Sequence, residues 1–239
     1  MIYIDILIKK YINESKYVNG LNVTALCSKN NMLKKEMNNE NINFYDDYDS
    51  MLDDIDAVFV ISSTNRRYNH VMQAFKKGKH VLCEAPVSTK REECIKMFDY
   101  SKKHNIVFME LLKTAYATAF TRLLLLVKSG TIGNVVSIDA TCTSLSDYID
   151  LSKSQILKKT NSICDWGPIC MLPAFLILGV NYRKKHYSTY YLDKDLNFDL
   201  FTKIDLVYDN AVATLKVGKG VKSEGELIIS GTKGYFYVP

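Results

Sequence analysis

Strands that alternate with helices are the feature that most constrains the fold of this sequence. The clearest strand is Asp56–Ser62, and the helical pattern that follows, Tyr68–Lys77, ends at Gly78. A second apolar strand leads from that glycine to Glu84, and a third covers Ile106–Leu111. This alternation predicts βαβ units, and therefore a parallel sheet with right-handed crossovers.

The pattern changes beyond Lys113. A helix is predicted near residues 116–128 and another at 165–178, with a long alternating strand at 134–143 between them. Four more strand-like runs follow, at residues 187–192, 201–208, 211–217 and 227–230. We therefore predict an α/β chain, with a Rossmann-type parallel-sheet domain over residues 1–113. An α+β domain with a mainly antiparallel sheet follows over residues 114–239.

Two helix starts carry capping signals. Thr89 and Glu92 have the spacing of a capping box, which predicts a helix N-terminus at that point. Asp165 stands at the start of the later helix, where a carboxylate is a good N-cap. The sequence leaves open whether Asp165 caps the helix or serves a site.

Composition and charge exclude several classes of protein. The net charge is +5, but the longest basic block is the four residues Arg183–His186, which is typical of a solvated loop, so no nucleic-acid partner is expected. The apolar run Leu123–Val127 is far too short to cross a membrane, and Asp5 within the N-terminal apolar run argues against a signal peptide. Six cysteines without a C-x-x-C pair predict reduced thiols in a cytoplasmic protein and no zinc site.

Several segments together carry a family resemblance. Gly78–Pro86 resembles the G-K-H-V-x-x-E-K-P signature of the Gfo/Idh/MocA family of NAD(P)-dependent oxidoreductases, with Ala85 in place of the family's lysine. Val58–Tyr68 resembles the family's V-x-I-A-T-P-N-x-x-H-Y segment, with Ser63 for the proline and Arg67 for the histidine. Four later segments match in family order, namely residues 108–110, 128–133, 165–168 and 225–234. The resemblance runs from about residue 6 to the last residue.

The resemblance implies hydride transfer between NAD or NADP and a sugar, a polyol or a related hydroxyl compound. In such enzymes a lysine amine exchanges the proton of the reacting hydroxyl, because burial tunes the pKa of an amine readily. Ala85 cannot ionise, and Ile169 is equally inert where many relatives have tyrosine or histidine. We therefore expect impaired catalysis. The alternatives are a non-catalytic regulatory or interaction protein on the same fold, and a fragment without a function of its own.

The resemblance also places a cofactor site at strand ends. Ser28 and Lys29 follow the second strand of the fold, where a hydroxyl and a cation favour the 2′-phosphate of NADP. The loop that holds the cofactor after the fourth strand corresponds to Ser62, Ser63 and Thr64. Glu84 and Pro86 end the next strand in the cofactor crevice. A solvated turn is the simpler interpretation of Ser28 and Lys29, whereas for Glu84 a place in the lining of the site is favoured over a plain surface carboxylate.

Two residues are the candidates for catalysis. Asp165 matches the acidic residue that the family brings to the substrate, and Lys113, an amine near the end of the 106–111 strand, is the candidate to replace the missing lysine. A solvated lysine is the simpler interpretation of Lys113.

Both ends of the sequence depart from the family pattern. Tyr3 and Asp5 stand where the glycines of the phosphate-binding turn belong, so the first strand and the Gly-rich turn are predicted to be missing and cofactor binding to be weakened. Residues 238 and 239 stop in the middle of the predicted sheet, which predicts C-terminal truncation. Sheet edges exposed in this way favour a homo-oligomer.

Overall fold

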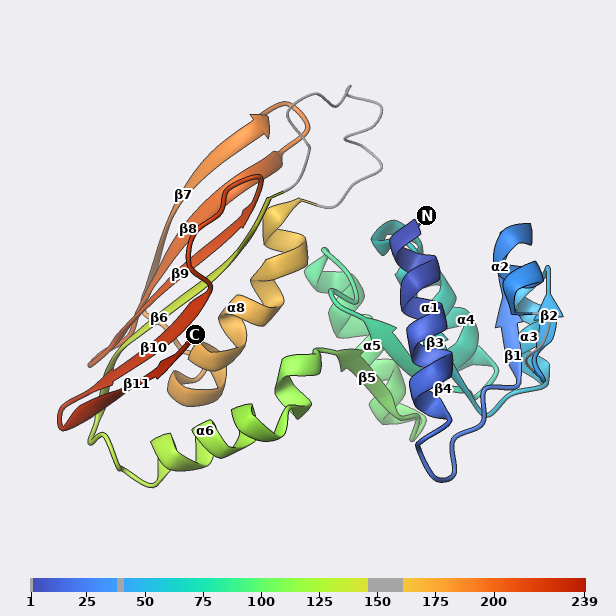
Figure 1. Cartoon of the computed structure of the whole chain (residues 1–239), viewed down its shortest axis with the longest axis horizontal. Helices are drawn as coiled ribbons and strands as arrows, with labels where there is room; N and C mark the ends of the chain where they lie inside the picture. Colours follow the sequence, from blue (N-terminus) through green and yellow to red (C-terminus); the bar gives the residue numbers. More distant parts are fainter. Residues whose placement is uncertain (1, 38–40, 146–160) are drawn as a thin grey trace. The chain divides into compact units, whose positions relative to one another are not determined.

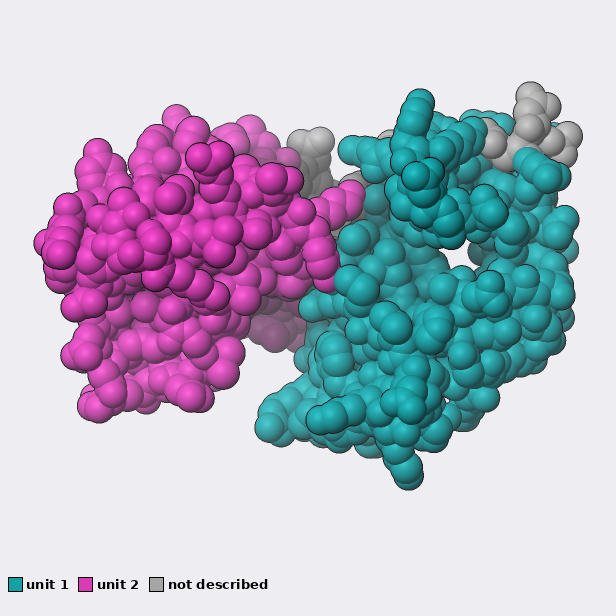
Figure 2. Space-filling model, turned by 90° about the horizontal axis from the view of Figure 1, so that it is seen from below, with its two compact units in different colours: residues 1–111 teal, residues 112–239 magenta. Residues whose placement is uncertain are grey.

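The computed structural model describes residues 2–37, 41–145 and 161–239. The chain divides into two compact units, residues 1–111 and residues 112–239, coloured separately in Figure 2. The boundary predicted at Lys113 lies just beyond this division. The two units are described separately below.

Unit 1 is built from short parallel strands and helices (Figure 1). Its helices are α1 (Ile2–Ser15), α2 (Asn31–Glu36), α3 (Tyr48–Asp53), α4 (Thr64–Lys76) and α5 (Arg91–Lys103). Its strands are β1 (Ala25–Cys27), β2 (Asn43–Tyr45), β3 (Ala57–Val60), β4 (His80–Glu84) and β5 (Phe108–Leu111). All pairings are parallel, as predicted, but they form two separate sheets, β1–β2 and β3–β4–β5.

The main core of unit 1 lies where α4 and α5 cover the β3–β4–β5 sheet. Val71 and Phe75 of α4 and Met97 of α5 are almost fully buried, together with Val81 and Cys83 of β4. Their helical and alternating spacings put these side chains on one side of each element. Burial raises the pKa of the Cys83 thiol to about 12, so this thiol stays protonated.

Glycine allows the turn between α4 and β4. Gly78 has a φ of 71°, a left-handed conformation that glycine adopts without steric cost. The N–H groups of Gly78 and Lys79 then donate to the last carbonyl groups of α4, those of Phe75 and Ala74. The predicted helix stop at Gly78 is confirmed.

The capping box predicted at Thr89 is wrong. Helix α5 has Lys90 as its N-cap, without a side-chain cap bond. The hydroxyl of Ser88 accepts from the N–H of Lys90 at 3.1 Å and donates to the Glu93 carboxylate at 2.6 Å. Ser88 is buried, so the tertiary environment selects this hydroxyl over the exposed Thr89.

Unit 2 is a six-stranded sheet with helices on one face (Figure 1). Its helical elements are the 3-10 turn η1 (Lys113–Tyr116), α6 (Thr118–Lys128) and α8 (Ser162–Leu178). Its strands are β6 (Val135–Ser144), β7 (Lys184–Asp193), β8 (Phe198–Val207), β9 (Val212–Lys219), β10 (Glu226–Gly231) and β11 (Gly234–Val238). The strand order is β11-β10-β6-β9-β8-β7, and only the pairing of β6 with β9 is parallel.

Alternation along these strands buries one face of the sheet under α8. Ile138, Leu215 and Ile229 are fully buried and pack in one cluster with Cys170 of α8. The mainly antiparallel sheet predicted for this half is therefore confirmed. Among the helices in the described part of the chain, none is long and apolar enough to span a membrane.

Candidate functional site

Arg67 organises the carboxyl ends of β3 and β4 in unit 1. This arginine lies in the first turn of α4, and only 6% of its surface is exposed. Its Nε donates to the carbonyl of Ser62 at 2.9 Å, and one Nη donates to the carbonyl of Pro86 at 2.6 Å. Its other Nη contacts the Glu84 carboxylate at 3.3 Å. One buried guanidinium therefore joins the loops that follow two neighbouring strands.

This arrangement fixes the backbone on both sides of Ala85. Arg67 holds Glu84 before it and Pro86 after it, and the N–H of Val87 donates to the Glu110 carboxylate of β5 at 2.9 Å. The Ala85–Pro86 peptide bond is cis. Glu84 is thus an ion-pair partner of Arg67 within the protein.

A second polar group follows β3. The Ser62 hydroxyl lies 2.9 Å from Nδ1 of His70, a residue of α4. Burial, and secondarily the positive charge of Arg66, lowers the pKa of His70, which favours the neutral imidazole. Ser63 precedes α4 as its N-cap residue, with its hydroxyl donating to the side chain of Asn65 at 2.7 Å, and Thr64 is the first helical residue.

A cavity of about 1110 Å³ adjoins these strand ends within unit 1. Three of the predicted cofactor residues, Ser28, Lys29 and Ser62, line it together with His70 and Arg66. The Ser28 hydroxyl also accepts from the N–H of Asn30 at 3.1 Å, in the turn that precedes α2. Ser63, Thr64, Glu84 and Pro86 are not among the residues that line this cavity. Of these four, Glu84 and Pro86 contact Arg67, and Ser63 and Thr64 lie at the start of α4.

In unit 2, Asp165 forms an ion pair with Lys219. Asp165 lies in the first turn of α8, and Lys219 is the last residue of β9. The side chains of Asp165 and Lys219 are 31% and 16% exposed. The N-cap of α8 is Asn161, whose side chain accepts from the N–H of Cys164 at 3.1 Å. The N-cap interpretation of Asp165 is therefore wrong.

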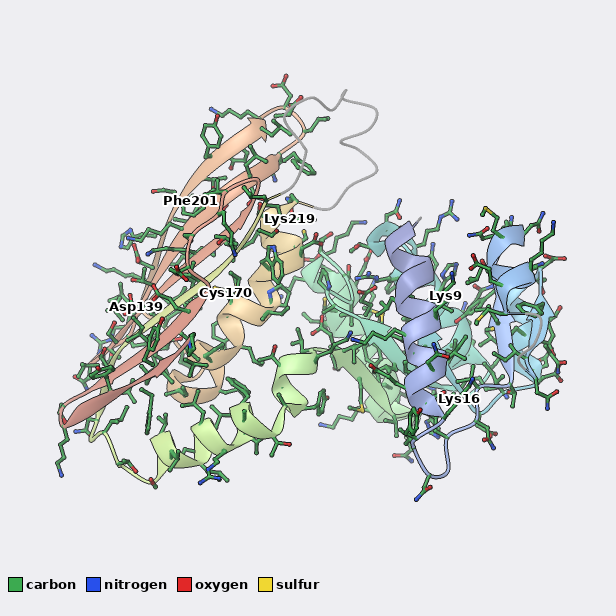
Figure 3. All side chains as sticks on the ribbon, in the orientation of Figure 1. Lys9, Lys16, Asp139, Cys170, Phe201 and Lys219 are labelled. Atoms are coloured by element: carbon green, nitrogen blue, oxygen red, sulfur yellow. The ribbon has the colours of Figure 1, made fainter. Side chains whose placement is uncertain are left out.

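Further contacts attach this end of α8 to the sheet. The buried hydroxyl of Ser162 donates to the carbonyl of Leu200 at 2.8 Å and accepts from the N–H of Lys219 at 2.9 Å. The carboxylate of Asp199, which is 3% exposed, accepts from the N–H of Ile163 at 3.3 Å and from Thr202 at 2.9 Å. Figure 3 labels Lys219 beside this helix end. The Asp165–Lys219 pair is therefore carried by two backbone segments, the first turn of α8 and the end of β9, that are hydrogen-bonded to each other through Ser162.

Sequence reasoning missed Lys219 as the amine beside Asp165. Lys113, the amine that it named, is exposed in η1 of unit 2. Lys219 ends the alternating strand β9, and a lysine at a strand end reads as solvated when its neighbours are unknown. Only the pairing of β9 with β6 and β8, and the packing of α8 across them, shows the contact.

Replacing this amine is expected to destabilise unit 2. A Lys219→Met variant keeps the apolar stem but leaves the half-buried Asp165 without its cation, at an expected cost of about 1–3 kcal/mol in the free energy of unfolding. Urea unfolding monitored by Trp166, which lies in the same helix, measures this cost. The double variant Lys219→Met, Asp165→Asn is expected to recover much of it. A single variant as stable as the parent would show that the pair is energetically neutral.

Comparisons with known proteins agree with the geometry of unit 1. The sequence model of the Gfo/Idh/MocA oxidoreductase family, NAD-binding Rossmann fold, matches residues 6–111. Scyllo-inositol 2-dehydrogenase (NADP(+)) of Bacillus subtilis is 28% identical over 134 residues, which cover 53% of this chain and 40% of that protein. D-xylose 1-dehydrogenase (NADP(+)) 2 of Haloferax volcanii is 29% identical over 176 residues, which cover 72% of this chain and 53% of that protein. The chain thus spans about half or less of the length of these curated relatives.

A solved structure extends the likeness to both units. The apo scyllo-inositol dehydrogenase from Lactobacillus casei superposes with a TM-score of 0.82 at 19% identity, covering 99% of this chain and 71% of that chain. At this identity the superposition shows a shared fold. Together with the family match, it leads to one conclusion: residues 6–111 match the NAD-binding Rossmann fold of the Gfo/Idh/MocA oxidoreductases, and the chain shares the fold of the solved dehydrogenase.

Proposed function

We propose that the protein is a NAD(P)-dependent oxidoreductase of a sugar, a polyol or a related hydroxyl compound, and that this copy is catalytically impaired. The observation that carries the proposal is the family match over the strand-end loops of unit 1. The named activities of the relatives, on scyllo-inositol and D-xylose, support a carbohydrate-like substrate. Under this proposal unit 1 binds the dinucleotide and unit 2 carries the substrate groups.

The residues in unit 1 fit part of a dinucleotide. Ser28 and Lys29, at the carboxyl end of β1, offer a hydroxyl and a cation for the adenosine ribose and a 2′-phosphate. Ser62, Ser63 and Thr64 offer hydroxyl groups and the N-terminus of α4 at the end of β3. Tyr3 and Asp5 lie in α1, and their side chains are outside the described part of the structure. When bound, the nicotinamide would supply or accept the hydride.

Proton handling is the step at which this chain differs from its family. Ala85 offers no ionisable group at the carboxyl end of β4, where Arg67 holds the adjoining backbone. In unit 2 the Asp165–Lys219 pair supplies a carboxylate and an amine that are held in place, and Lys113 adds a solvated amine. We assign substrate binding to Asp165, with Lys219 positioning it. The expected result is substrate binding with slow proton exchange.

Cofactor choice can be tested at Lys29. A Lys29→Glu variant is expected to weaken NADPH binding by about tenfold or more, because it replaces a charge-assisted contact with repulsion of the 2′-phosphate. NADH, which lacks this phosphate, should bind within about twofold of the parent. Titration of nicotinamide fluorescence measures both affinities. Equal weakening for the two nucleotides would mean that Lys29 does not read the 2′-phosphate, and no binding of either by the parent would contradict the proposed function.

A non-catalytic role on the same fold is the second candidate function. The observation in its favour is Ala85, since loss of the general acid–base group lowers the rate by a large factor while the fold persists.

Two edge strands of unit 2 carry exposed tyrosines that suit association into a homo-oligomer. They are Tyr187 and Tyr190 of β7 and Tyr235 and Tyr237 of β11. Six free cysteines suit a cytoplasmic location.

A further inference from the structure

Two cysteine side chains meet where α8 packs on the sheet of unit 2. Cys170 of α8 is 1% exposed, and its sulfur lies 3.3 Å from the carbonyl oxygen of Ala140 and 3.6 Å from that of Lys216. Ala140 belongs to β6 and Lys216 to β9, and these two strands pair with each other. Figure 3 labels Cys170 where α8 lies against the sheet. The Cys170 thiol is therefore held by contacts to two strands.

The second thiol belongs to Cys142 of β6. Cys142 follows Ala140 by two positions, so both side chains lie on the face of the strand that α8 covers. Cys142 packs against the same apolar cluster as Cys170, and the two thiols are hydrogen-bonded to each other. Cys142 is only partly buried, whereas Cys170 is buried. Small reagents can therefore reach one thiol of the pair, while the other is enclosed.

The hydrogen bond makes the two thiols differ in acidity. A thiolate at Cys142 accepts from the Cys170 thiol, which lowers the pKa of Cys142, although burial acts in the opposite direction. The same hydrogen bond, together with burial, raises the pKa of Cys170. Cys142 is therefore the thiol that ionises first and the better nucleophile, and Cys170 keeps its proton beside it.

We propose that Cys142 and Cys170 form a redox-responsive dithiol, which hydrogen peroxide converts to a disulfide between β6 and α8. The Cys142 thiolate attacks one peroxide oxygen and the O–O bond breaks, which gives a sulfenic acid and hydroxide. The Cys170 sulfur then attacks the Cys142 sulfur, the S–O bond breaks, and the Cys170 proton leaves with the oxygen as water. With the proton that Cys142 released, the hydroxide becomes a second water. The dithiol thus loses two electrons, and one peroxide is reduced to two waters.

The disulfide would join the helix that carries Asp165 covalently to the sheet. Such a link restricts the unfolded chain, so the oxidised chain is expected to unfold at a temperature about 5–10 °C above that of the reduced chain. In reducing compartments, disulfides that form transiently in this way serve catalysis or redox sensing. The proposal goes beyond the oxidoreductase function, because it needs neither dinucleotide nor substrate.

Peptide mapping of the full chain after treatment with hydrogen peroxide tests the pairing. Trypsin places Cys142 in peptide 129–153 and Cys170 in peptide 160–183, which also contains Cys164. Alkylation under denaturing conditions before digestion blocks the thiols that remain. The expected product is one linked pair of these peptides, and further cleavage before Asp165 separates Cys164 from Cys170 and assigns the link to Cys170. Dithiothreitol should release the link and reverse the thermal shift, which circular dichroism measures.

Cysteine variants provide matched controls. Cys170→Ser is expected to abolish the link and to leave Cys142 as a sulfenic acid, which dimedone labels. Cys164→Ser, in the same helix, should form the link as the parent does. Because alanine lacks the donor that serine retains, iodoacetamide should alkylate Cys142 about threefold or more slowly in Cys170→Ala than in Cys170→Ser. Equal alkylation rates would contradict the activation of Cys142 by Cys170.

Four further results would overturn the proposal. The first is free thiols at both positions after the native chain has been treated with millimolar peroxide. The second is a link through Cys164 in place of Cys170. The third is a link between two chains, seen by non-reducing electrophoresis, in place of one within the chain. The last is a linked chain that unfolds at no higher temperature than the reduced chain. Because the nucleotide titration is separate, failure here leaves the proposed function standing.

Discussion

An Ala85→Lys variant is expected to oxidise polyols or sugars with NADP⁺ about 10²–10⁴ times faster than the parent chain. The reason is that hydride removal from a hydroxyl-bearing carbon requires transfer of the hydroxyl proton, and alanine cannot accept it. The surrounding backbone is already fixed by Arg67, which binds the carboxylate of Glu84 and the carbonyl of Pro86. A lysine at position 85 would therefore extend from a rigid turn at the carboxyl end of β4.

The measurement is the initial rate of NADPH formation with a panel of inositols, aldoses and polyols. Ala85→Met is the matched control, because it has similar length and no amine. The gain should also increase with pH, since only the neutral amine accepts a proton. An equal gain in the methionine variant would attribute the effect to packing. No gain in a variant that binds NADPH normally would favour the interaction role over a lapsed enzyme.

An Arg67→Met variant is expected to destabilise unit 1 by about 3–5 kcal/mol, which is typical for removing one partner of a buried ion pair. The side chains of Arg67 and Glu84 are only 8% and 18% exposed, so the carboxylate would lose its cation with little water to replace it. The carbonyl groups of Ser62 and Pro86 would lose donors at 2.9 and 2.6 Å as well. Three contacts therefore fail together.

Urea unfolding, with far-UV circular dichroism as the signal, measures this loss. Arg67→Lys retains the charge but cannot donate in three directions, so an intermediate loss is expected. The double variant Arg67→Met, Glu84→Gln should be more stable than the single variant, because it also removes the carboxylate charge that faced Arg67. A loss below about 1 kcal/mol in Arg67→Met would place this pair in the range of surface salt bridges and contradict its structural role.

Local signals in the sequence were sufficient for most of the elements. The turn after α4 was predictable because Gly78 can adopt a left-handed conformation. The strands β3, β4 and β5 were predictable from the composition and length of their apolar runs. Parallel strand direction followed from the alternation of strands with helices. The failed capping box at Thr89 shows the limit of such signals, because burial of the neighbouring Ser88 decided which hydroxyl bonds the helix end.

The sequence by itself determined the order of the elements and the change from a parallel to a mainly antiparallel sheet, because these depend on spacings between near neighbours. Only the tertiary structure decided which distant groups meet. Asp165 and Lys219 are 54 positions apart, and Arg67 reaches Pro86 across 19. Long-range contacts follow from strand order and packing, which no local pattern encodes.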